Sequence, residues 1–103
     1  MANLNTLSVN IEPKEGCIAS AMRVLGQKWT ALILRDLNSG PKRFCELEHS
    51  VDNITPRVLS KRLSDLESQG IVSLKDSYYN LTKKGSDLMP TLKQMASWGN
   101  KYP

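Results

Sequence analysis

Residues 55–70 constrain the fold of this 103-residue chain more than any other segment. Thr55 can accept a hydrogen bond from an unpaired backbone N–H, and Pro56 suits the first position of a helix. Gly70 is typical of the position just beyond a helix, so we expect the helix to end at Gln69. The helical period gives this segment one buried apolar face, formed by Leu59, Leu63 and Leu66 with Val58 beside them.

Three shorter helical patterns precede this segment. Residues 17–25 carry apolar side chains at helical spacing, namely Ile18, Ala21, Met22 and Leu25, and Gly26 ends the pattern. The second pattern contains Trp29, Leu32, Ile33 and Leu37, and residues 38–41 stop it. The third is expected to begin at Lys42 and Arg43, with Phe44 and Leu47 on its inner face, and residues 51–54 form the turn that follows.

Two strands and a last helix complete the chain. Residues 71–75 and 78–82 are expected to form strands joined by a tight turn at Asp76 and Ser77. Residues 86–102 are expected to be helical, with Leu88, Leu92, Met95 and Trp98 facing inward. Pro90 is unfavourable inside a helix, so either the helix begins near Ser86 with Pro90 in its first turn, or it kinks there.

This order of elements predicts a winged helix-turn-helix. The fold class is mainly α with a small β-wing, made of about five helices and a two-stranded antiparallel hairpin. We expect an N-terminal arm over residues 1–16 and one folded domain over residues 17–103. Neither a signal peptide nor a membrane span is apparent, so a cytoplasmic protein with reduced cysteines is expected.

The N-terminal half of the residue 55–70 helix is basic. Residues 55–64 contain three basic residues and no acid, while the net charge of the chain is +4 and its pI about 9.2. Such a surface suits insertion into the DNA major groove, with Arg57 placed to bind a guanine edge. The alternative is a solvated basic face. The candidate DNA-binding residues are Thr55, Arg57, Ser60, Lys61, Arg62 and Ser64 on this helix, Lys42 and Arg43 for phosphate contacts, and Lys75 at the wing tip.

The motifs along the chain resemble those of the HxlR family of bacterial and archaeal transcriptional regulators, a MarR-like branch of winged-helix proteins. The matching positions are Cys17, residues 26–29, 32–35, 40–47, 54–70 and 79–85, and Trp98, which together span about four-fifths of the chain. Two features depart from the family pattern. The wing is short, which puts minor-groove contacts from it in doubt, and the last helix ends soon after Trp98, which suggests a smaller interface.

The resemblance implies a homodimer that binds double-stranded DNA at inverted repeats near promoters. Its first and last helices would form the dimer interface, which here involves Ile18, Met22, Leu92, Met95 and Trp98. The alternative assigns these side chains to an ordinary core. A two-fold dimer would place its recognition helices about 34 Å apart, matching half-sites one DNA turn apart.

Cys17 is a candidate redox or electrophile switch. It lies at the expected start of a helix, where the N-terminus stabilises a thiolate, and some regulators that resemble this chain use a cysteine at the matching position as a sensor. The alternative is a small side chain that fills the dimer interface. The effector itself is not identified by the sequence.

Other functions have weaker support. Cys45 and His49 share one helical face, but two ligands are too few for a metal site, and no metal or other cofactor is expected. The chain has one histidine, no glycine-rich phosphate loop and no recognisable pair of catalytic carboxylates, so an enzyme is not expected. A winged-helix module that binds protein instead of DNA remains the alternative function.

Overall fold

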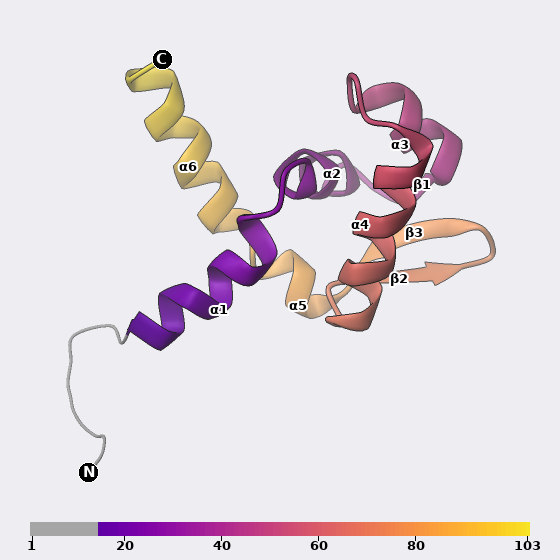
Figure 1. Ribbon diagram of the computed structural model, residues 1–103, viewed down its shortest axis with the longest axis horizontal. Coiled ribbons are helices and arrows are strands. Elements are labelled where there is room, and N and C mark those ends of the chain that lie inside the picture. The colour runs from indigo at the N-terminus through magenta and orange to yellow at the C-terminus, as the bar shows by residue number, and fades with distance from the viewer. Residues whose placement is uncertain (1–14) are drawn as a thin grey trace, which may run out of the picture.

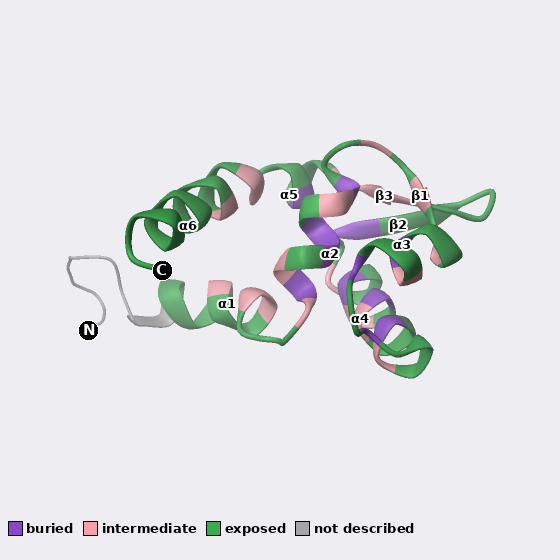
Figure 2. Cartoon of the chain, turned by 90° about the horizontal axis from the view of Figure 1, so that it is seen from above, coloured by how far each residue is buried: buried purple, intermediate pink, exposed green. Residues whose placement is uncertain are grey.

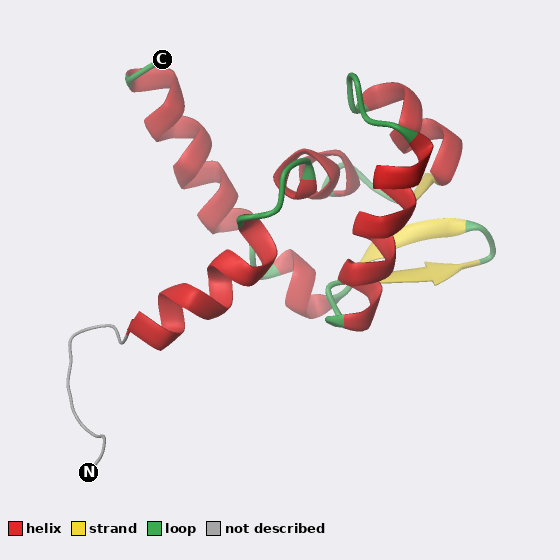
Figure 3. Ribbon diagram, viewed as in Figure 1, coloured by secondary structure: helices red, strands yellow, loops and turns green. Residues whose placement is uncertain are grey.

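The computed structural model describes residues 15–103 and confirms the winged helix-turn-helix (Figures 1 and 3). The helices are α1 (Glu15–Leu25), α2 (Thr30–Leu37), α3 (Phe44–Ser50), α4 (Pro56–Ser68), α5 (Lys83–Ser86) and α6 (Met89–Lys101). The strands are β1 (Lys42–Arg43), β2 (Val72–Lys75) and β3 (Tyr78–Leu81). Residues 1–14 of the expected N-terminal arm lie outside the described residues, and its last two residues begin α1.

The molecule has two ends of different character. Helices α2, α3 and α4 pack with the strands at one end, which we call the core end, while α1 and α6 extend away at the other, which we call the open end (Figures 1 and 2). The core end holds the buried apolar side chains, namely Ile33, Leu34, Leu37, Leu47, Val51, Ile54, Leu59, Leu63, Leu66, Ile71 and Val72.

The sheet has three strands, not the two that the sequence predicts. Its order is β1-β3-β2, and both pairs are antiparallel. Lys42 and Arg43, expected to begin a helix, instead pair with Tyr79 and Tyr78. The expectation was wrong because Arg43 is extended (φ −82°, ψ 161°) and caps helix α3, which begins at Phe44. The Arg43 backbone N–H donates a hydrogen bond to Glu46 Oε1, in the first turn of α3, at 2.7 Å.

The turn between β2 and β3 lies where the sequence predicts it. Asp76 and Ser77 both have positive φ angles, 52° and 72°. Two consecutive residues of this kind form the tight turn whose twist matches that of an antiparallel hairpin. The hairpin is therefore compact and brings Lys75 directly opposite Tyr78.

Helix α4 begins and ends almost as predicted. Thr55 Oγ1 accepts a hydrogen bond from the Val58 backbone N–H at 3.2 Å. At the other end Gly70 adopts φ 74°, its N–H donates to the Glu67 carbonyl at 3.0 Å, and the Ile71 N–H donates to the Leu66 carbonyl at 2.9 Å. This pair of bonds is the Schellman motif, which stops a helix and turns the chain.

Two helical registers differ from the prediction. In α2 the buried residues are Thr30, Ile33, Leu34 and Leu37, so Leu32, expected inside, is 38% exposed. Trp29 has φ 80° and is not helical, so α2 begins at Thr30. The buried stripe therefore starts at Thr30, one position later than the stripe predicted from Trp29. At the C-terminus, the expected helix begins at Met89 instead of near Ser86, after a four-residue helix, α5, that the sequence does not predict. Pro90 lies in the first turn of α6, where its missing N–H costs least.

Candidate nucleic-acid interface

The outer face of α4 carries most of the predicted DNA-binding side chains. Arg57, Ser60, Lys61 and Ser64 are all exposed, as is Thr55 just before the helix. They are opposite the buried stripe of Leu59, Leu63 and Leu66. Lys61 Nζ is 3.1 Å from Asp65 Oδ1, an exposed pair one helical turn apart that contributes little to stability. The face is therefore polar, basic in its first half and accessible.

Arg62 lies apart from this face. Its side chain is only 19% exposed. Its Nε donates to the Lys28 carbonyl at 3.3 Å, and its terminal nitrogen is 3.4 Å from Asp65 Oδ2. Arg62 therefore joins α4 to the turn between α1 and α2, and its charge does not add to the outer face.

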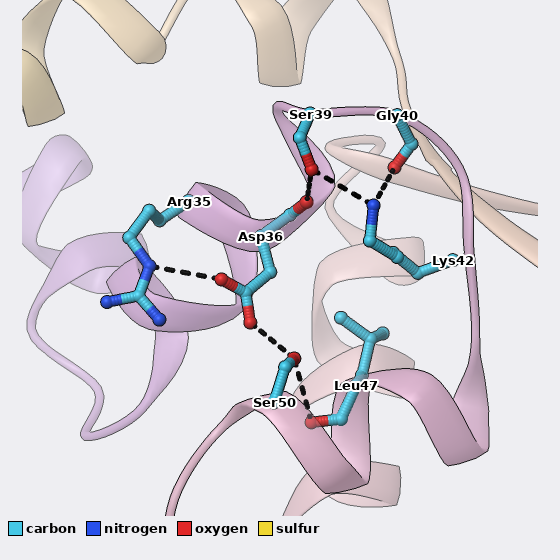
Figure 4. Close-up of polar contacts among 7 residues, drawn as sticks. All are labelled: Arg35, Asp36, Ser39, Gly40, Lys42, Leu47 and Ser50. Carbon is cyan, nitrogen blue, oxygen red and sulfur yellow. Dashed lines mark hydrogen bonds and ion pairs between the residues drawn. The ribbon is translucent and has the colours of Figure 1, made fainter.

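Lys42 and Arg43 are adjacent in β1 but differ in environment. Lys42 is half-buried, and its Nζ donates to Ser39 Oγ at 3.0 Å and to the Gly40 carbonyl at 3.5 Å (Figure 4). Arg43 is exposed, and its guanidinium lies 5.0 Å from the centre of the Tyr78 ring. A hydrogen bond with Tyr78 raises the pKa of Arg43, so the side chain stays cationic. Lys75 is also exposed, at the wing tip.

Polar contacts between α2 and α3 fix the start of the helix-turn-helix (Figure 4). The Asp36 carboxylate accepts from Ser50 Oγ at 2.6 Å and from Arg35 Nε at 3.0 Å. Ser50 is the last residue of α3, so this bond ties the end of α3 to the end of α2. The end of α3 is therefore fixed relative to α2, and the turn that leads from α3 to α4 buries Val51 and Ile54.

The open end exposes the residues predicted to form a dimer interface. Ile18 is 57% exposed, Met22 51%, Met95 48% and Trp98 66%, while Leu92 is half-buried against the core. The sequence prediction missed two more exposed apolar side chains, Leu32 and Tyr102. It also missed a groove of about 770 Å³ between α2 and α6. The groove is lined by Ala31, Leu32, Arg35, Asn38, Met89, Pro90, Leu92, Lys93, Met95 and Ala96.

Both cysteines are exposed thiols. Cys17 lies in the first turn of α1, as the sequence predicts, and Cys45 lies on α3 with the exposed His49 one turn away. Within residues 15–103, no cluster of three or more histidine, cysteine, aspartate or glutamate side chains is placed to hold a metal ion. Among the same residues, no helix has the length and apolar character needed to cross a membrane.

Comparisons with known proteins agree with this geometry. A family model described as HxlR-like helix-turn-helix matches residues 24–103. The HTH-type transcriptional regulator YkvN of Bacillus subtilis is 38% identical over 86 residues, covering 77% of this chain and 73% of YkvN. The crystal structure of quinone-bound YodB from B. subtilis has a TM-score of 0.78 and 35% identity, covering 82% of this chain and 97% of YodB. The redox regulator HypR in its oxidised form has a TM-score of 0.75 and 31% identity, covering 84% of this chain and 96% of HypR. The chain belongs to the HxlR-like helix-turn-helix family of transcriptional regulators.

Proposed function

We propose that this regulator binds an inverted-repeat operator as a homodimer and inserts the N-terminal half of α4 into the major groove. One observation carries the proposal: the outer face of α4 is exposed, and residues 55–64 contain no acid. A helix in the groove lies between two phosphate backbones, so an acidic residue there would be repelled from both sides. Arg57, near the helix N-terminus, is assigned to a base edge, where arginine binds guanine O6 and N7.

The homodimer rests on the open end. Helices α1 and α6 both leave large apolar side chains exposed, and the groove between α2 and α6 extends the same surface. Burying such side chains contributes roughly 1.5–3 kcal/mol each, so a second copy that covers both helices gains substantial stability. A two-fold axis at this end leaves both α4 helices uncovered, and in an inverted repeat each helix reaches one half-site of the same duplex.

We further propose that Cys17 makes DNA binding sensitive to oxidants or electrophiles. Cys17 is exposed and belongs to α1, one of the two helices assigned to the interface. Modification there alters the surface on which the partner packs, and so alters the spacing of the two recognition helices. The redox and quinone-bound forms of the relatives motivate the proposal, although the family match begins at residue 24 and does not include Cys17.

Binding to promoter DNA tests both proposals. Fluorescence anisotropy is measured against fragments from the source genome, including the one upstream of this gene, with a scrambled duplex as competitor. We expect specific binding by the reduced protein and weaker binding after treatment with the thiol oxidant diamide. Cys17→Ser should remove the response to diamide, and Cys45→Ser, a matched change at the other exposed thiol, should keep it.

The outcomes separate the alternatives. Specific binding that ignores diamide keeps the regulator and makes Cys17 a structural residue. A response that persists in Cys17→Ser but is lost in Cys45→Ser moves the sensor to α3. If binding to every promoter fragment is as weak and as salt-dependent as binding to the scrambled duplex, operator recognition is contradicted. The protein-binding module is then favoured.

A further inference from the structure

The turn between α1 and α2 holds a tryptophan in a backbone conformation that favours glycine. Trp29 has φ 80° and ψ −20°, values close to those of the third residue of a type II turn, where glycine or asparagine is usual. The turn closes where the Thr30 backbone N–H donates to the Gln27 carbonyl at 3.2 Å. A bulky residue keeps this conformation only when the contacts around it hold it there. The surroundings of Trp29 therefore decide whether the turn keeps this shape.

Arg62, on the inner side of α4, supplies one of these contacts. The peptide between Lys28 and Trp29 is the central peptide of the turn, and type I and type II turns differ by a flip of that peptide. Its carbonyl, that of Lys28, accepts a hydrogen bond from Arg62 Nε at 3.3 Å. A flip to type I would give Trp29 an unstrained negative φ but would point the carbonyl away from Arg62. The hydrogen bond therefore stabilises the strained form of the turn.

Further contacts hold both partners of this bond. Asp65, one turn along α4, places Oδ2 3.4 Å from a terminal nitrogen of Arg62 and so orients the guanidinium. On the other side, the Trp29 ring packs against the core, and Lys28 Nζ lies 4.9 Å from the centre of that ring. The guanidinium therefore bridges a carboxylate of its own helix and the central peptide of a distant turn, and both ends of the bridge are fixed.

This turn is where α1 is attached to the core end. Helix α1 contacts α2 at its inner end and extends away from the rest of the molecule (Figure 1). In the described part of the chain, the bond from Arg62 to Lys28 is the only hydrogen bond that joins residues 17–29 to α4. A small polar pocket of about 80 Å³ lies beside it, between α1, α2 and α4, so side-chain packing does not fill the junction. The direction of α1 therefore depends on the turn and on the bond that holds it.

We propose that Arg62 is a positioning residue, which holds the peptide between Lys28 and Trp29 and thereby fixes the direction of α1 relative to the recognition helix α4. In the proposed homodimer α1 belongs to the interface, so its direction sets the separation and the tilt of the two α4 helices. Arg62 thus determines which half-site spacing the regulator accepts, without contacting DNA. The inference rests on the proposed function and adds to it a determinant of operator spacing.

The direction of α1 can be measured without DNA. Spin labels are placed on Cys45 of α3 and on Ser20→Cys, on the face of α1 opposite its apolar stripe, in a chain that also carries Cys17→Ser. Labelled protein is diluted with unlabelled protein, and double electron–electron resonance gives the distribution of distances between α1 and α3 within one protomer. We expect one narrow distribution when Arg62 is present and a broader or divided one in Arg62→Met, because the turn is then free to flip.

Lys84→Met is the matched control. Lys84 Nζ donates to the Gln69 carbonyl at 2.7 Å, so this variant also loses one positive charge and one bond between a side chain and the backbone at α4, but on the side of α5. We expect it to keep the narrow distribution. Arg62→Lys keeps the charge but lacks the planar fork that reaches Lys28 and Asp65 together, so it should behave like Arg62→Met. A distribution that is unchanged in Arg62→Met, or fully restored by lysine, would contradict positioning by the guanidinium.

Operators of different spacing test the consequence for DNA binding. Anisotropy titrations compare the operator, versions with one or two base pairs added or removed between the half-sites, and a single half-site. If Arg62→Met leaves about a tenth of the molecules with the correct direction of α1, affinity for the preferred spacing falls roughly tenfold. Affinity for the single half-site should stay the same, because the outer face of α4 is untouched, so the preference among spacings flattens. Thermal unfolding followed by circular dichroism checks that each variant is folded, and Arg62→Lys replaces Arg62→Met if the latter is not.

The results separate this role from the function on which it rests. If Arg62→Met weakens binding to the single half-site as much as binding to the operator, Arg62 contacts DNA and the positioning role is wrong. An unchanged preference among spacings in a folded variant contradicts the role as well, since loss of stability alone does not alter that preference. If the wild-type chain binds no operator, the proposed function is wrong and the role in spacing falls with it. The resonance measurement then still decides whether Arg62 holds α1.

Discussion

The core end and the open end contain helices with similar apolar patterns but opposite burial. Helix α4 buries Leu59, Leu63 and Leu66 almost completely, whereas none of the residues of α6 is buried. Trp98, the largest apolar side chain of α6, is 66% exposed. The sequence pattern of a helix therefore shows which face is apolar, but not whether that face meets its own chain or another molecule.

The difference follows from what each helix can reach. The stripe of α4 meets α2, α3 and β2, which surround it within one unit. Helices α1 and α6 contact α2 at their inner ends and then diverge from each other (Figure 1). Their outer turns have no further element of this chain to cover them among the described residues. A substitution at the core end should consequently change the stability of the fold, whereas a substitution at the open end should change dimer assembly.

Substitution at the core end should have the largest effect on stability. Leu59 has no exposed surface, so Leu59→Ala should lower the free energy of unfolding by about 2–5 kcal/mol through lost burial and the cavity left behind. Urea denaturation measures this value. Leu74→Ala is the matched control, since Leu74 is 47% exposed on the wing and its loss should cost no more than about 0.5 kcal/mol. Equal losses for the two leucines would contradict the division into core and surface.

Substitution at the open end should change assembly while the core end stays folded. Trp98→Asp places a charge in the proposed interface, so we expect a monomer by sedimentation and an operator affinity lower by on the order of 100-fold, because one protomer engages only one half-site. Circular dichroism should show the helices retained. Asn100→Asp adds the same charge on the same helix and should leave the mass unchanged. An unaltered mass for Trp98→Asp would remove Trp98 from the interface.

Recognition should depend on the outer face of α4. Arg57→Ala should weaken operator binding by about 1–3 kcal/mol and relax the preference at one base pair. Arg23→Ala, which removes a charge from α1, is the control and should preserve both affinity and preference. Anisotropy titrations against operators altered one base pair at a time measure the effect. An operator preference that survives in Arg57→Ala would mean that a different residue of α4 contacts that base.

Local signals explain why the sequence predicts α4 so well. Its start depends on Thr55 and Pro56, its end on Gly70, and its buried face on the leucine spacing, and all of these act within a few residues. The wing turn is predicted for the same reason, since Asp76 and Ser77 lie between two strand patterns. The fold class follows from the order of these locally specified elements.

Contacts between distant segments explain what the sequence does not predict. Strand β1 has two residues and exists only because they pair with Tyr78 and Tyr79, more than thirty positions away. The Arg62 side chain lies away from the outer face of α4 because it donates to the Lys28 carbonyl, a contact that spans 34 positions. The exposure of Leu32 depends on where α6 lies and on the start of α2 after Trp29. None of these three features has a local sequence pattern. The pairing of β1, the contact of Arg62 with Lys28 and the exposure of Leu32 therefore required the structure.

Arg62 gives the smallest effect and the sharpest distinction within α4. Arg62→Ala removes the bond from α4 to the Lys28 carbonyl, so we expect the free energy of unfolding to fall by about 1 kcal/mol. It should leave the salt slope of DNA binding unchanged, whereas Arg57→Ala should lower the slope or the sequence preference, although both variants lose one positive charge. If Arg62→Ala reduced the slope by about 0.9 with no change in stability, Arg62 would be a phosphate contact that leaves Lys28 when DNA binds. The comparison separates a charge that supports the recognition helix from a charge that the helix presents to its ligand.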